Sequence, residues 1–106
     1  MTKYDLYGSM MSDMESARLC IEGLLEITFI RKESLYYCGE YFFYGEKGKE
    51  NFILTKNADP FDNEAAELRF PQYNVLLYIN STLNSAEFFQ KISKNDKLIL
   101  LRSEEN

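Results

Sequence analysis

A chain of 106 residues is long enough to form one domain with its own hydrophobic core. Apolar residues make up 45% and aromatic residues 15% of it, which excludes an intrinsically disordered protein. The net charge of −5 argues against direct binding of nucleic acid, because proteins that bind the phosphate backbone need a basic surface. The same charge favours encounter with a basic partner.

The chain contains no histidine, which removes the commonest general base, the Ser–His and Cys–His nucleophile pairs and most zinc sites. Cys20 and Cys38 lack the spacing of metal ligands or of a redox pair, so we expect two ordinary core thiols. We predict neither a metal nor a cofactor. Without a signal peptide or a long apolar run, the sequence predicts a cytoplasmic protein that does not contact the membrane.

Weak alternation over residues 3–8 predicts a short strand. A capping box at residues 12–15 then predicts a helix that begins after Ser12. Arg18 and Glu22 lie one turn apart on its polar side. Its apolar stripe comprises Met14, Ala17, Ile21, Leu24, Leu25 and Ile27.

The stretch 34–44 is rich in Tyr and Phe, and we predict that it forms the central strand of a sheet, preceded by an extended segment over 28–33. A two-residue period places Tyr37, Gly39, Tyr41 and Phe43 on one face and Tyr36, Cys38, Glu40, Phe42 and Tyr44 on the other. Gly39 inside a strand indicates a bulge or a close backbone approach. A turn over 45–48 leads to residues 50–56 as the hairpin partner.

Residues 57–72 are predicted to form a long acidic loop, with at most one helical turn over 63–68. Pro60 and Pro71 interrupt regular structure in this segment. It carries four carboxylates, at Asp59, Asp62, Glu64 and Glu67, against the single Arg69. Long loops in compact domains are usually functional or disordered, so this loop is the best local candidate for a contact surface.

The apolar run 73–79 predicts a buried strand, and Asn84 is expected to cap a second helix with a staple between Leu83 and Phe88. Residues 98–101 predict the last strand, and 103–106 a frayed tail. The order β-α-β-β-β-α-β predicts one α+β domain over 1–106, with a mostly antiparallel sheet of about five strands and two helices on one face. A ferredoxin-like arrangement with the loop inserted before its second half fits this order.

The predicted elements carry residues that could serve acid/base catalysis, calcium binding or base stacking. Glu40 is the obvious carboxylate for acid/base work, but we expect it to face solvent or to pair with a basic residue on a neighbouring strand, and we predict no enzyme. The loop carboxylates lack the spacing of a calcium site, which leaves solvated charge or a docking site for Lys and Arg as their two interpretations. Base stacking on the aromatic strand needs basic neighbours, and this strand offers Glu40 instead.

The stretch from Ser34 to Phe42 resembles a pattern of small bacterial immunity proteins, including those of contact-dependent growth inhibition. That pattern runs Ser-x-Tyr-x-Gly-Gly-x-Tyr-Tyr after an amphipathic helix, and here Cys38 replaces its first glycine and Phe42 its last tyrosine. The resemblance covers about residues 4 to 56. It implies a non-enzymatic inhibitor that binds the C-terminal nuclease domain of a cognate toxin and blocks its active site or substrate groove.

A basic, RNA-cleaving toxin domain is therefore the expected partner, and a homo-oligomer is compatible with this function but not required by it. The residues expected to bind the partner are Asp59, Asp62, Glu64 and Glu67, with Tyr36 or Tyr44 if either is exposed. The alternative function is a non-enzymatic α+β module that senses a ligand or self-assembles through its aromatic sheet.

Overall fold

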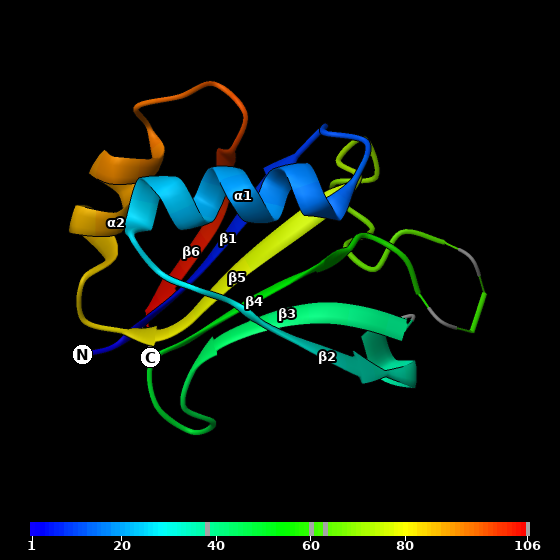
Figure 1. The fold of residues 1–106 in the computed structure, drawn as a ribbon, viewed down its shortest axis with the longest axis horizontal. Coiled ribbons are helices and arrows are strands. Elements are labelled where there is room, and N and C mark those ends of the chain that lie inside the picture. Colours follow the sequence, from blue (N-terminus) through cyan, green and yellow to red (C-terminus); the bar gives the residue numbers. More distant parts are fainter. Residues whose placement is uncertain (38, 60, 63, 106) are drawn as a thin grey trace.

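The computed structural model describes residues 1–37, 39–59, 61–62 and 64–105. Expectations that concern Cys38, Pro60, Asn63 and Asn106 lie outside these residues. Within the described chain, six strands form one antiparallel sheet and two helices cover one of its faces, which confirms the α+β prediction with one strand more than expected (Figure 1).

The sheet has the strand order β2-β3-β4-β5-β1-β6. Its strands are β1 (Lys3–Ser9), β2 (Ile30–Ser34), β3 (Gly39–Gly45), β4 (Asn51–Lys56), β5 (Val75–Thr82) and β6 (Ile99–Glu105). The helix α2 (Ser85–Ile92) joins β5 to β6 across β1, as in a split β-α-β unit. The strands β4, β5, β1 and β6 follow the ferredoxin-like order, and β2 and β3 extend the sheet beyond it.

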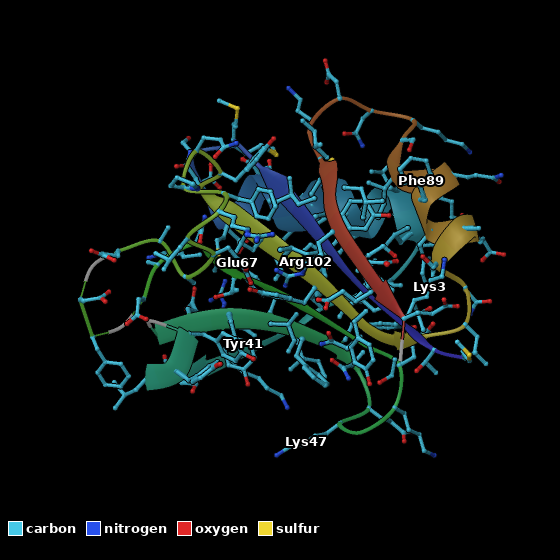
Figure 2. The ribbon with its side chains drawn as sticks, turned by 180° about the vertical axis from the view of Figure 1, so that it is seen from behind. Lys3, Tyr41, Lys47, Glu67, Phe89 and Arg102 are labelled. Carbon is cyan, nitrogen blue, oxygen red and sulfur yellow. The ribbon has the colours of Figure 1, made fainter. Side chains whose placement is uncertain are left out.

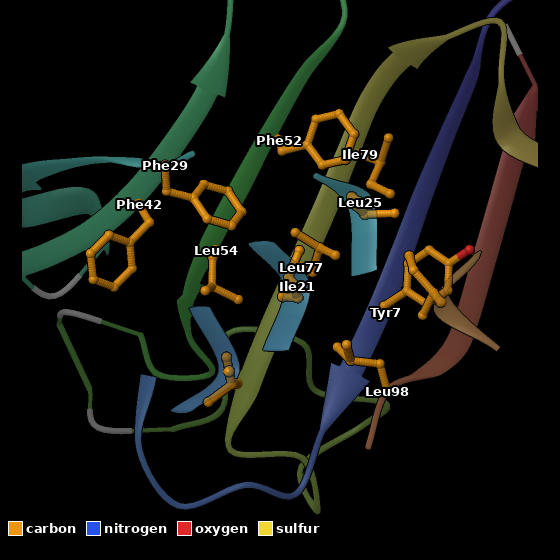
Figure 3. Close-up of a cluster of buried hydrophobic side chains, with 13 residues drawn as sticks. Tyr7, Ile21, Leu25, Phe29, Phe42, Phe52, Leu54, Leu77, Ile79 and Leu98 are labelled. Atoms are coloured by element: carbon orange, nitrogen blue, oxygen red, sulfur yellow. The ribbon is translucent and has the colours of Figure 1, made fainter. Parts of the chain in front are cut away.

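The hydrophobic core lies between the helices and the sheet (Figure 3). The helix α1 (Met14–Leu25) buries Ala17, Ile21 and Leu25 along one side, as its apolar periodicity predicts. The strands contribute inward-facing side chains at alternate positions, among them Tyr7, Phe42, Phe52, Leu54, Leu77 and Ile79. No helix in the described part of the chain is long and apolar enough to cross a membrane.

The start of α1 differs from the prediction by one residue. Asp13, not Ser12, is the N-cap, and its Oδ1 accepts a hydrogen bond from the Ser16 amide at 2.7 Å. Asp13 has extended backbone angles, which point its carboxylate at the unpaired amides of the first turn. The predicted pair of Arg18 and Glu22 is present, with an N–O distance of 3.0 Å.

The prediction of a single central strand over 34–44 is wrong, because the chain reverses within this stretch. Residues Leu35–Tyr37 form a 3₁₀ turn, and the Ser34 Oγ accepts a hydrogen bond from the Tyr36 amide at 3.2 Å. A serine hydroxyl that binds a nearby amide competes with strand pairing and favours a turn. Gly39 then re-enters the sheet with φ of 106°. The result is a hairpin of β2 and β3, with β2 at the edge of the sheet and β4 and β5 at its centre.

The C-terminal segment also differs from its prediction. Residues 103–105 belong to β6 and pair with β1, so they are not a frayed tail. The hydroxyls of Ser103 and Ser85 donate hydrogen bonds to the two oxygens of the buried Asp5 carboxylate, which fastens β6 and the start of α2 to β1. Asn84 occupies the N-cap position of α2 as predicted, but its side chain makes no capping hydrogen bond. Leu83 is 76% exposed and forms no staple.

Two glycine substitutions test the turn that divides the aromatic stretch. Gly39→Ala should lower the free energy of unfolding by about 1–3 kcal/mol, because alanine is strained at a positive φ although nothing lies within 4 Å of the added methyl. Gly23→Ala is the control in α1, also with nothing within 4 Å, and should raise the free energy of unfolding by about 1 kcal/mol. Urea denaturation measures both, and a stabilising Gly39→Ala would contradict the turn geometry.

Candidate partner-binding surface

The acidic loop between β4 and β5 is held at its base by one amide side chain. The Nδ2 of Asn57 donates hydrogen bonds to the carbonyls of Phe70 and Tyr73 at 2.9 and 2.8 Å. Its Oδ1 accepts from the Glu67 amide at 3.0 Å. The described residues of this loop form turns and bends, so the helical turn predicted over 63–68 is absent from residues 64–68. Asn57 therefore closes the loop as a defined structure.

Glu67 pins the loop to the face of the sheet that carries no helices. Its Oε2 accepts a hydrogen bond from the Tyr78 hydroxyl at 2.6 Å, and its Oε1 lies 3.1 Å from the Arg102 Nη1 (Figure 2). Only 18% of the Glu67 side chain is exposed. Burial of Tyr78, together with its hydrogen bond to Glu67, raises the pKa of this phenol. The hydrogen bond to Glu67 likewise raises the pKa of Arg102.

Glu67 was expected among the partner-binding carboxylates, and the structure places it elsewhere. Its carboxylate is engaged by the Tyr78 hydroxyl and by Arg102, which also pairs with Glu104. Because Tyr78 and Arg102 come from β5 and β6, local sequence gave no sign of this contact. Glu67 positions the loop instead.

The tip of the loop is organised by its other carboxylates. The Oδ1 of Asp59 accepts a hydrogen bond from the Phe61 amide at 2.8 Å, and the Oδ1 of Asp62 accepts one from the Glu64 amide at 3.1 Å. The Asp59 amide donates to the Glu64 carbonyl at 2.7 Å. Asp59 is half-buried, whereas Asp62 and Glu64 are exposed. These short contacts hold the tip in a compact turn.

Phe61 is 87% exposed at this tip, and the sequence analysis did not single it out. A phenylalanine in a loop of acidic and turn-forming residues has no strand or helix partner that could bury it. The position of Phe61 in such a loop could therefore have indicated from the sequence that its ring is exposed. Large exposed apolar groups in a polar setting are typical of interaction sites.

The turn between β2 and β3 leaves the sheet at the same end as the acidic loop. Because β2 and β4 run in the same direction, the segments that follow them emerge together (Figure 1). Tyr36 in this turn is 73% exposed and its neighbour Leu35 is also exposed. We define the acidic-aromatic end as Leu35, Tyr36, Phe61, Asp62 and Glu64.

Tyr44 does not belong to this end. It lies near the opposite end of β3, and its ring packs edge-on against Phe52 with a centroid distance of 5.6 Å. Phe52 in turn contacts Phe88 of α2. Tyr44 therefore covers the core, with 37% of its surface left exposed.

Glu40 pairs with a basic residue on the neighbouring strand, as expected. Its Oε2 lies 3.6 Å from the Nε of Arg31, whose Nη2 also contacts the Glu15 carboxylate at 2.9 Å. Arg31 thus holds both carboxylates on the helix side of the sheet, where its guanidinium also lies over the Phe42 ring. Among the residues that the structure describes, no group of three or more acidic or thiol side chains is placed to hold a metal ion.

No family model, curated protein or solved structure matches this chain. The exposed surfaces and their chemistry therefore carry the functional argument.

Removing the Tyr78 hydroxyl tests the anchor of the loop. Tyr78→Phe should lower the free energy of unfolding by about 1–2 kcal/mol, because it removes a hydrogen bond to a charged group. It should also speed tryptic cleavage after Arg69, since the loop loses one of its contacts with the sheet. Tyr36→Phe removes an exposed hydroxyl and is the matched control that should change neither quantity. Equal cleavage of both variants would show that the Glu67 contact does not hold the loop.

Proposed function

We propose that this chain is an immunity protein. In this proposal it acts in the cytoplasm, binds the C-terminal nuclease domain of a cognate toxin and covers that domain's active site or substrate groove. No catalysis by the immunity protein is involved. The observation that supports this function is the acidic-aromatic end, where Phe61 and Tyr36 are exposed at the same end of the sheet as the exposed carboxylates of Asp62 and Glu64.

This combination suits a basic nuclease. Aromatic side chains that insert into a partner supply much of the binding energy of protein interfaces. Carboxylates around them complement a cationic groove that otherwise holds phosphate, and they speed association. Asp62 and Glu64 are exposed and have no salt bridge within the described chain, so they remain free for such a role. The net charge of −5 adds long-range attraction to a basic partner.

The residues that carry the resemblance to immunity proteins serve as scaffold in this proposal. Ser34 and Gly39 build the turn that presents Tyr36, and Phe42 is buried under the helices. The contacts with the toxin would then come from the acidic-aromatic end, which this scaffold holds in place.

The alternative, a non-enzymatic module that senses a ligand or self-assembles, has its own observation. Tyr41 and Phe43 lie half-exposed on the sheet face opposite the helices. Self-association through such a face would give an oligomer that persists at high salt, because apolar contacts are not screened.

Variants of the acidic-aromatic end test the immunity proposal against the C-terminal domain of the protein encoded just upstream. By calorimetry, Phe61→Ala should weaken binding about 10- to 100-fold, because a central aromatic anchor is lost. Asp62→Asn combined with Glu64→Gln should slow association and flatten its salt dependence. Phe89→Ala is the control, since Phe89 is exposed on α2 away from this end (Figure 2).

Two results would contradict this assignment. Tight binding that is unchanged in all three variants would move the interface away from the acidic-aromatic end. Absence of binding, with a salt-resistant oligomer in size-exclusion chromatography, would favour the self-assembling module.

A further inference from the structure

The sheet face opposite the helices is hollowed over β2, β3 and β4. This hollow, the open-face groove, has a volume of about 590 Å³. Its walls include Lys32, Tyr37, Tyr41, Phe43 and Lys47, and Figure 2 shows Tyr41 on this face and Lys47 extending from the β3–β4 turn. Hollows of this size hold small organic ligands in many proteins.

The rings in the groove are already arranged for stacking. Tyr37 and Tyr41 have ring centroids 4.5 Å apart, tilted by 43°. Tyr37, Tyr41 and Phe43 are each half-buried, so every ring is fixed by packing yet keeps an accessible part. Desolvation of the Tyr37 phenol, with the neighbouring Tyr36 and Tyr41, raises its pKa.

The groove is locally positive on an acidic protein. No carboxylate lines it, whereas Lys32 and Lys47 both do. The Lys32 Nζ lies 4.5 Å from the Phe43 ring centroid, and no salt bridge of either lysine occurs among the described residues. Glu46, the neighbour of Lys47, pairs with Lys49 at 3.4 Å.

This placement overturns the sequence argument against base stacking. The objection was that the strand offers Glu40 in place of basic neighbours. The two-residue period places Glu40 on the face opposite Tyr41, and there it contacts Arg31. The charged side chains that line the groove with Tyr41 and Phe43 are Lys32, which is the register partner of Tyr41, and Lys47.

We propose that the open-face groove binds a single nucleotide. Its base stacks on Tyr41 and Tyr37, and its phosphate lies between Lys32 and Lys47. Stacking on aromatic side chains suits any base, because every base has a π-face. A lysine ammonium is a compact point charge that binds phosphate well.

The neighbouring hollow argues for a mononucleotide rather than a strand. Ile53 at the wall of the groove is the register partner of Tyr78, which lines a second hollow of about 450 Å³. Glu104 and Glu105 line that hollow with the buried Asp5 and with Arg102, which pairs with Glu104 at 3.0 Å. Three acidic residues against one arginine leave this hollow unfavourable for the phosphates of a continuing strand.

A nucleotide site in the open-face groove deepens the ligand-sensing alternative and does not depend on the immunity proposal.

Titration calorimetry of the full chain with AMP tests the proposal at low salt. Saturable binding of AMP is expected, with adenosine and inorganic phosphate each at least about fivefold weaker, because the site recognises both parts. Tyr41→Leu and Lys47→Ala should each weaken AMP binding at least about fivefold. Lys49→Ala is the matched control, because Lys49 lies in the same turn but is paired with Glu46.

Circular dichroism confirms that each variant folds, and Lys32→Met replaces Tyr41→Leu if that variant does not. Absence of saturable AMP binding at millimolar concentration overturns the proposal. So does an equal loss of affinity in Lys47→Ala and Lys49→Ala. An oligoadenylate that binds much more tightly than AMP overturns the assignment to a single nucleotide. Loss of toxin binding in Phe61→Ala with retained AMP binding would separate this site from the toxin interface.

Discussion

The turn over Leu35–Tyr37 is the constraint on which both candidate surfaces depend. The Ser34 hydroxyl binds the Tyr36 amide, and Gly39 takes a positive φ that other residues avoid, so an aromatic stretch that suits one long strand folds back on itself. The reversal lifts Tyr36 out of the sheet at one end. It also fixes the faces of β3, with Phe42 against the helices and Tyr41 on the open side. A continuous strand would have had no exposed tip at this point.

Polar contacts place the acidic loop next to that tip. Asn57 closes the base of the loop, and Glu67 fastens it to β5 and β6 through Tyr78 and Arg102. The contact engages one carboxylate and leaves Asp62 and Glu64 exposed. Side chains that are anchored in advance lose less entropy when a partner binds. Of the four loop carboxylates, Glu67 is thus used to hold the loop to the sheet, Asp59 and Asp62 accept hydrogen bonds from amides of the tip, and Asp62 and Glu64 stay exposed.

Sequence reasoning succeeded where local pattern decides structure. The spacing of apolar residues predicted both helices. The turn residues over 45–48 predicted the hairpin of β3 and β4. The single strand predicted over 34–44 failed because a local turn at Ser34 and Gly39 outweighs strand propensity. Two other failures involve partners distant in the chain. Glu67 meets Arg102 across 35 positions, and Ser103 joins the sheet by binding Asp5. Alternation correctly separated Glu40 from Tyr41 and Phe43, but it could not show that Lys32 of β2 lies beside Tyr41, because that neighbour depends on the pairing of two strands.

Hydrogen exchange of this chain, alone and mixed with the C-terminal domain of the protein encoded just upstream, is the most direct test of the proposed function. We predict that amides over 35–37 and 61–64 become protected on binding, while those of β6 and of the open-face groove exchange as in the free protein. Protection confined to the open face, or to α2, would contradict the assignment of the acidic-aromatic end as the toxin-binding surface.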